Sequence, residues 1–85
     1  MLTETQTKIL KIVNNQLTSS NIAKMTGITH SSIYKNIKDM QMLGVINRSE
    51  KIGRCYYILL TNEGKQVQEL IYQIDSILFR IEKNK

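Results

Sequence analysis

The chain has 85 residues and carries twelve Lys and Arg against seven Asp and Glu, a formal net charge of +5. Its length predicts one small domain, and a hydrophobic fraction of 41% suffices for a packed core, which excludes a largely disordered chain. No stretch approaches the roughly 18–20 apolar residues of a membrane span, and the N-terminal sequence lacks the layout of a signal peptide. The basic charge favours a polyanionic partner, either nucleic acid or a membrane surface.

Residue types that carry catalysis or bind metals are sparse. Cys55 is the single cysteine, so no intrachain disulfide forms, and we interpret it as a strand residue rather than a functional thiol. His30 is the single histidine and lacks the second His or Cys that a zinc site needs. No Gly-rich phosphate loop and no nucleophile–base pair is recognisable. We therefore expect no enzyme, no cofactor and no metal.

Two helices are predicted in the first part of the chain. The apolar spacing over residues 3–16 gives one broad face, and Thr3 is suited to cap the helix. A second, shorter helix is predicted over residues 20–25, with Met25 on its inward face. Gly27 ends this helix, because glycine adopts positive φ without steric cost.

A third helix is predicted over residues 29–43, beginning at Thr29 as N-cap and ending before Gly44. Its inward face consists of apolar residues at spacings of four and three, Ile33, Ile37 and Met40. Its opposite face is polar, basic and rich in hydroxyls, with one aromatic ring, and comprises His30, Ser31, Tyr34, Lys35 and Lys38.

The hydrophobic period then changes to that of a β-hairpin. Residues 45–49 are the predicted first strand, residues 50–54 the tip, and residues 55–60 a return strand rich in aromatic and β-branched residues. Alternation places on one face of the return strand Tyr56, Ile58 and Leu60. Basic residues lie in the tip or lead into it, at Arg48, Lys51 and Arg54.

A long fourth helix is predicted over residues 62–83, with apolar residues that repeat at intervals of seven. Its first half is expected to pack on the first helix, whereas the second half would leave an exposed apolar patch. We therefore predict a homodimer interface formed by Leu70, Ile74, Ile77, Leu78 and Ile81. The fold class is mainly α with a β-hairpin (α+β), divided into residues 1–61 and a dimerisation helix, residues 62–85.

Three segments in register carry a resemblance to a known fold. They are residues 22–33, with a small Ala23 four residues before Gly27; residues 40–46, where a helix runs into a strand; and residues 60–64, where the return strand enters a capped helix. The order resembles the winged helix-turn-helix transcription regulators of MarR-like type, and the small winged-helix proteins of archaea and their viruses. The resemblance covers about residues 5–70.

This resemblance implies that the third helix enters the major groove of DNA and that the hairpin tip, the wing, contacts backbone or minor groove. Carried over, the recognition-helix residues are Thr29, His30, Ser31, Ser32, Tyr34, Lys35 and Lys38. The corresponding wing residues are Arg48, Lys51 and Arg54. Lysine and arginine suit phosphates and guanine acceptors, and hydroxyls suit phosphates or base edges.

Alternatives remain for single residues. An exposed lysine is commonly only solvated, His30 could cap the third helix, and Tyr34 could pack against the first helix.

The sequence therefore predicts a homodimeric, sequence-specific regulator that binds double-stranded DNA, most simply a repressor by occlusion, with no membrane partner and no small-molecule effector. The alternatives are an architectural, chromatin-like DNA binder and a winged helix that binds proteins. The expected location is the cytoplasm, associated with the nucleoid, or the host cytoplasm for a virus. One Ala against 13 Ile, 9 Lys and 7 Asn suggests an A/T-rich genome and fits an archaeal or viral source.

Overall fold

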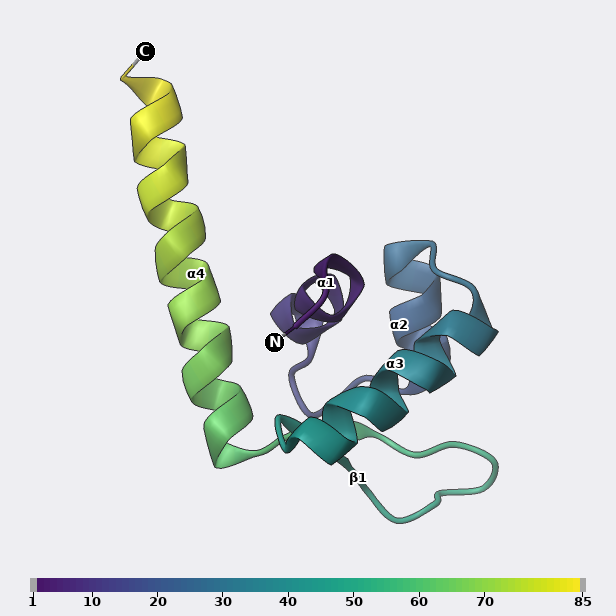
Figure 1. Ribbon diagram of the computed structural model, residues 1–85. Helices are drawn as coiled ribbons and strands as arrows, with labels where there is room; N and C mark the ends of the chain where they lie inside the picture. The colour runs from purple at the N-terminus through teal and green to yellow at the C-terminus, as the bar shows by residue number, and fades with distance from the viewer. Residues whose placement is uncertain (1, 85) are drawn as a thin grey trace.

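The computed structural model describes residues 2–84, and Met1 and Lys85, the outermost residues of the two predicted segments, lie outside this range. The elements follow in the order α1 (Glu4–Ile12), α2 (Ser19–Thr26), α3 (His30–Leu43), β1 (Ile46–Arg48), β2 (Ile58–Leu60) and α4 (Asn62–Lys83) (Figure 1). The predicted winged helix-turn-helix with a long C-terminal helix is confirmed.

Every helix within residues 2–84 begins after a threonine whose hydroxyl accepts a hydrogen bond from the backbone N–H three residues later. These N-caps are Thr3, Thr18, Thr29 and Thr61. In α1 and α2 the residue three positions on also returns a side-chain bond to the cap N–H, which completes a capping box. The helix starts are therefore fixed locally by the sequence.

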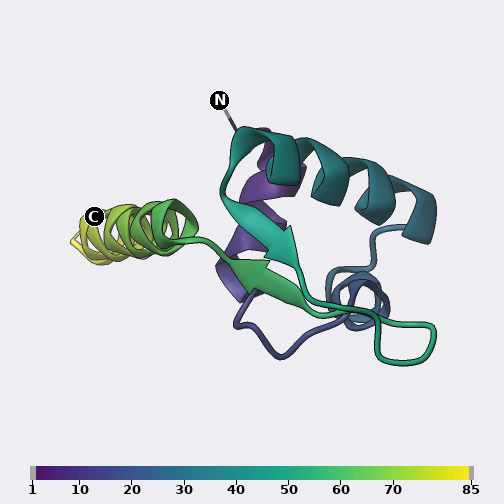
Figure 2. The same cartoon turned by 90° about the horizontal axis from the view of Figure 1, so that it is seen from below.

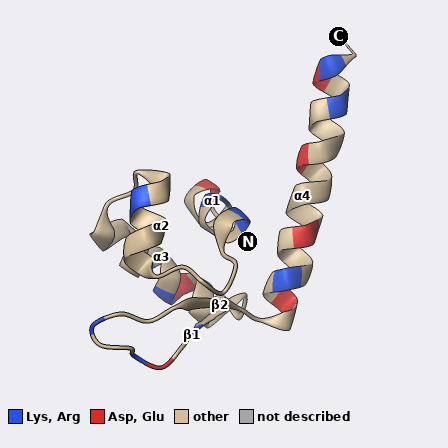
Figure 3. Ribbon diagram, turned by 180° about the vertical axis from the view of Figure 1, so that it is seen from behind, with Lys and Arg blue, Asp and Glu red and all other residues tan. Residues whose placement is uncertain are grey.

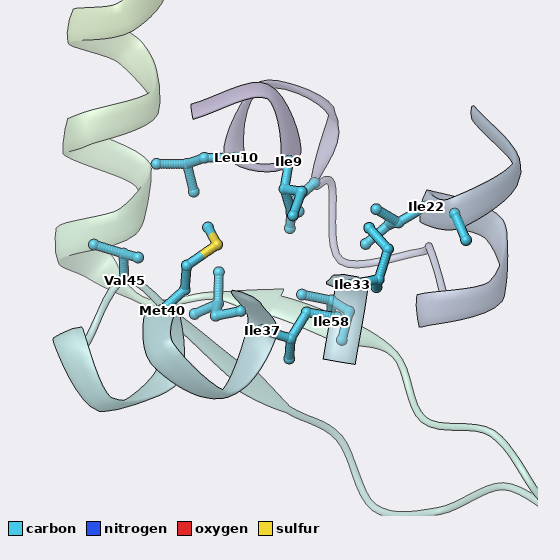
Figure 4. Packing of buried hydrophobic residues seen from close by; sticks show 11 residues of the cluster. Ile9, Leu10, Ile22, Ile33, Ile37, Met40, Val45 and Ile58 are labelled. Atoms are coloured by element: carbon cyan, nitrogen blue, oxygen red, sulfur yellow. The ribbon is translucent and has the colours of Figure 1, made fainter. Parts of the chain in front are cut away.

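A single aliphatic cluster forms the core. Its fully buried side chains come from all elements but α4, and they are Ile9, Leu10, Val13, Ile22, Ile33, Ile37, Met40, Ile46 and Ile58. Figure 4 shows side chains of α1, α2, α3 and β2 pointing toward one another. The predicted inward face of the third helix is confirmed, because Ile33, Ile37 and Met40 are all buried.

Two helix predictions differ from the structure. The first helix ends at Ile12 rather than at residue 16, because Asn15 adopts a positive φ of 68° and its side-chain oxygen accepts a hydrogen bond from the Leu60 N–H at 2.7 Å. Met25 is 60% exposed rather than inward. The buried side of α2 is formed by Ile22 and Ala23, and a residue two positions after Ala23 lies on the other side of a helix.

The strands are shorter than predicted but antiparallel, with Ile46 opposite Leu60 and Arg48 opposite Ile58. The outer edge of β2 is covered by the segment before α2, where the Ile58 N–H donates to the Leu17 carbonyl at 2.9 Å. A bridge between Thr18 and Tyr57 continues this pairing. The sheet edge is thus closed, and the rest of the hairpin projects as a loop (Figure 2).

The ends of α3, of both strands and of α4 meet at one joint. The Thr61 hydroxyl donates to the Gly44 carbonyl at 2.6 Å and accepts from the Gly64 N–H at 2.9 Å. The Thr61 N–H donates to the Val45 carbonyl at 3.2 Å. Gly64 lies so close that a Cβ there would be 1.9 Å from the Val45 carbonyl oxygen.

Beyond this joint, α4 runs beside α1 and then leaves the body, so the molecule measures 50 × 26 × 22 Å (Figure 1). Its first turns are docked, because Val67 and Ile71 pack against the core and Gln68 donates to the carbonyls of Leu10 and Val13 at 2.7 and 2.8 Å. None of the helices within residues 2–84 is long and apolar enough to cross a membrane.

We predict that Gly64→Ala lowers the free energy of unfolding by about 1–3 kcal/mol, the usual cost of forcing extra atoms into a packed site. In an unobstructed helix the same change would raise it by up to about 1 kcal/mol. The sign therefore reports the contact with the Val45 carbonyl, and urea unfolding measures it. Lys65→Ala, at an exposed position of the same turn, is the control and should change little; a stabilised Gly64→Ala protein would contradict the close approach.

Candidate nucleic-acid interface

The helix-turn-helix is built from α2, a tight turn and α3. Gly27 has a φ of 73° and its N–H donates to the Ala23 carbonyl, which closes the end of α2. The Thr29 hydroxyl then accepts from the Ser32 N–H at 3.3 Å, which opens α3. Only two residues separate Gly27 from the start of α3 at His30, and the small Ala23 is buried where the two helices meet.

The outward face of α3 holds most of the predicted recognition residues. His30, Ser31, Lys35 and Lys38 are exposed, and Tyr34 is 52% exposed. Ser32 does not join them: it is half-buried, and its carbonyl and hydroxyl oxygens both accept from the Asn36 side-chain amide, at 2.8 and 3.3 Å. Thr29 is exposed but acts as the cap of the helix.

The wing extends the hairpin past the core. The Ser49 N–H donates to the Tyr57 carbonyl at 3.0 Å, and the Tyr57 N–H donates to the Ser49 hydroxyl at 2.8 Å. At the tip Ile52 and Cys55 form a bridge around Gly53, which has a φ of 69°. Lys51 precedes this turn and Arg54 lies within it, and both are exposed. Figure 2 shows that the tip projects away from α4.

Arg48 lies at the base of the wing rather than at its tip. It is the last residue of β1, and its guanidinium carbon is 5.0 Å from the centroid of the Tyr56 ring. Both residues line the space between α3 and the hairpin.

Two adjoining hollows occupy that space. The first, of about 320 Å³, is lined by Tyr34, Ile37, Lys38, Gln41, Arg48 and Tyr56. The second, of about 360 Å³, is lined by Gln41, Asn47, Arg48, Ser49, Lys51 and Tyr56. They share three residues, and no carboxylate from residues 2–84 lines either one. The crease between helix and wing is therefore a cationic groove.

Sequence reasoning selected as site residues only Tyr34, Lys38, Arg48 and Lys51 of those that line the groove, and it missed Ile37, Gln41, Asn47, Ser49 and Tyr56. The Gln41 side-chain N–H donates to the Asn47 side-chain oxygen at 3.4 Å, which ties α3 to β1. Helical spacing contained a signal for Gln41, because it follows Tyr34 by seven residues and Lys38 by three. For Tyr56, alternation predicted the face that it shares with Ile58 but not its contact with Arg48.

Positive charge gathers on the helix-turn-helix and wing. Eight Lys and Arg stand against three acidic residues in positions 1–61, whereas positions 62–85 hold four of each. Figure 3 shows basic residues on α2, α3 and the wing, with acidic residues also on α3 and the wing, and mixed signs along α4. Lys11 and Asp75 form the one ion pair within residues 2–84. The lysines and arginines of α3 and the wing therefore have no carboxylate partner among the described residues. They are available to an external anion.

The described residues contain no group of three or more His, Cys, Asp and Glu side chains that could hold a metal ion. Cys55 is exposed on the wing rather than packed in a strand.

Comparison with known proteins identifies the family to which this chain belongs and the solved structures that share its fold. A family model described as HTH domain matches residues 5–82. The chain belongs to the helix-turn-helix (HTH) domain family. A comparison with curated protein sequences found no match.

Solved structures share the whole fold at low sequence identity. FabT of Streptococcus pneumoniae, determined in complex with DNA, matches with a TM-score of 0.87 at 16% identity, over 98% of this chain and 61% of FabT. The adhesin competence repressor AdcR of Streptococcus pyogenes matches with 0.87 at 23% identity, over 98% and 63%. A MarR protein from Peptoclostridium difficile matches with 0.88 at 18% identity, over 99% and 57%.

The HTH chain thus has the fold of MarR-type winged helices, as its motifs predicted. It spans less than two thirds of the length of each of these three proteins.

The cap of α3 gives a testable prediction. Thr29→Ala should lower the free energy of unfolding by about 1 kcal/mol, because the Ser32 N–H loses its acceptor, whereas Thr29→Ser should keep most of it. Urea unfolding of the free protein measures both. Equal stability of the alanine variant and the parent protein would mean that the hydroxyl has no capping role.

Proposed function

We propose that this HTH protein is a sequence-specific regulator of transcription that binds double-stranded DNA as a homodimer and represses by occlusion. The observation that carries the proposal is the carboxylate-free groove between α3 and the wing, flanked by exposed cations. Support comes from the shared fold: FabT was determined in complex with DNA, and AdcR is a repressor. The proposed activity is binding, without catalysis.

In this proposal the outward face of α3 lies in the major groove. Tyr34 and Lys35 are exposed near its N-terminal half, where side chains reach base edges. Lys35 can donate to guanine acceptors, and the Tyr34 ring can contact a thymine methyl group. Lys51 and Arg54 on the wing supply phosphate contacts, and Arg54 is suited to a narrow minor groove.

The dimer proposal rests on the two faces of α4. Its α1 side carries Gln68, Tyr72 and Asp75, which bond to carbonyls of α1 or to Lys11. The apolar stripe consists of Leu70, Ile74, Ile77 and Ile81, each about half exposed. The stripe is offset from the α1 side by two residues, which turns it roughly 160° around the helix.

The stripe therefore faces away from its own body. A second copy that buried the two stripes together would remove an exposed apolar patch rare in monomers. Leu78 lies beside the stripe, and residues 62–85 remain the proposed dimerisation segment. A two-fold dimer would present two α3 helices to half-sites about 34 Å apart on DNA.

The first test divides base reading from phosphate binding. Tyr34→Ala and Lys35→Ala should each reduce discrimination between a selected site and a mismatched one by a factor of about 5–150. Lys51→Ala and Arg54→Ala should weaken both duplexes alike and lower the slope of log K against log salt by about 1. Titrations of fluorescent duplexes, with sites selected from random DNA, measure both effects.

Lys83→Ala is the matched control, since it removes the same charge at the far end of α4 and should leave affinity unchanged. If all four interface variants lost affinity in the same pattern, the division of roles would be wrong. A discrete footprint supports a regulator, whereas continuous coverage of DNA would favour an architectural protein.

The second test concerns the dimer. Ile77→Glu should convert the protein to a monomer at micromolar concentration, because a charge would be buried in the stripe. Ser76→Glu adds the same charge to a neighbouring exposed position off the stripe and should remain dimeric. Sedimentation velocity distinguishes the two, and a parent protein that sediments as a monomer would refute the interface.

A further inference from the structure

Arg48 and Tyr56 lie at the edge of the core, where the hairpin begins to extend beyond it. Arg48 follows the buried Ile46 by two residues, and Tyr56 precedes the buried Ile58 by two. Side chains two residues apart lie on the same face of a strand. Arg48 and Tyr56 therefore lie on the same face of the hairpin as the buried Ile46 and Ile58. Beyond the core this face borders the groove beside α3.

The pairing register explains why the two side chains meet. Arg48 is directly opposite Ile58, which makes Tyr56 its diagonal neighbour across the hairpin. Diagonal neighbours are within reach of each other when one is aromatic and the other is long. The distance of 5.0 Å between guanidinium carbon and ring centroid lies within the range of a cation–π contact.

Tyr56 is itself held in place. It is half-buried and packs against the core, whereas Arg48 is exposed. A fixed ring beneath a long and otherwise mobile cation restricts the directions that the cation takes. The ring keeps the guanidinium beside the groove, across from Lys38 on α3.

We propose that Tyr56 is a positioning residue that orients Arg48 toward a backbone phosphate of DNA in the groove between α3 and the wing. The inference rests on the proposed function. With α3 in the major groove and the wing tip at the minor groove, the strand between the two grooves crosses the hollows that Lys38, Arg48 and Lys51 line. Arginine matches a phosphate with two parallel N–H donors, provided that its plane is oriented.

A double-mutant cycle separates positioning from packing. Arg48→Ala should lower affinity for duplex DNA and reduce the salt slope by about 1. Tyr56→Leu should lower affinity by a factor of about 2–5, the equivalent of an exposed cation–π contact. In the Arg48→Ala background, Tyr56→Leu should have no further effect, because the residue through which it acts is gone.

Two further variants serve as controls. Tyr56→Phe keeps the ring and should restore parental affinity and salt slope. Tyr57→Leu removes the neighbouring ring, which alternation places on the other face, and should leave the salt slope unchanged. Urea unfolding of each variant checks that the binding assay reports folded protein.

Additive losses from Arg48→Ala and Tyr56→Leu, in a parent protein that binds DNA, would overturn the positioning role and leave the proposed function standing. Failure of the parent protein to bind any duplex at low salt would overturn the proposed function. The orientation is also testable without DNA: by NMR, ring-current shifts of the Arg48 side-chain protons should persist in Tyr56→Phe and vanish in Tyr56→Leu. Unshifted protons in the parent protein would overturn the inference directly.

Discussion

The hydroxyl of Thr61 holds together the parts of the molecule that the candidate interface requires. It donates to the carbonyl at the end of α3 and accepts from the first turn of α4, while the Thr61 N–H pairs with Val45 at the start of the hairpin. Gly64 lies so close to the Val45 carbonyl that the first turn of α4 and the start of the hairpin are tightly packed here. Together with the bond from the Gln41 side chain to Asn47, this joint fixes how α3 lies against the start of the hairpin, and the groove lies between these two elements.

The same joint sets the direction of α4. One side of this helix docks on α1, and the other carries the exposed apolar stripe. Gln68 satisfies two carbonyls near the C-terminal end of α1, which would otherwise lack helical partners. Tyr72 and Asp75 extend this polar contact by one to two turns. Val67 and Ile71 in the first turns also pack against the core, whereas the later isoleucines Ile74, Ile77 and Ile81 remain about half exposed in the monomer. An apolar stripe turned away from the body is the arrangement expected of a helix that serves a second copy.

Much of this fold was predictable because its signals are local. The threonine caps, the glycines after α2 and α3, and the spacing of Ile33, Ile37 and Met40 each act within a few residues. The end of α1 was not predictable, since it depends on a bond from Leu60 to Asn15, 45 residues earlier. The outward face of α3 was identified from spacing, whereas the placement of Ser32 required the bonds from Asn36. Alternation also placed Tyr56 on the same face as Ile58. How far the hairpin extends beyond the core depends on tertiary packing, which the sequence pattern does not contain.

The apolar stripe on α4 and the groove beside α3 are connected through the joint at Thr61 and also through α1, which contacts both helices. A force that changed the separation of two α4 helices would act on Gly64 and Thr61, and these residues contact the end of α3 and the start of the hairpin directly. The helix lies so close to the Val45 carbonyl at Gly64 that a side chain on that residue would collide with the backbone. In the proposed dimer, the pairing of the apolar stripes would set the separation of the two α4 helices, and the joint at Thr61 would pass that separation on to the two α3 helices.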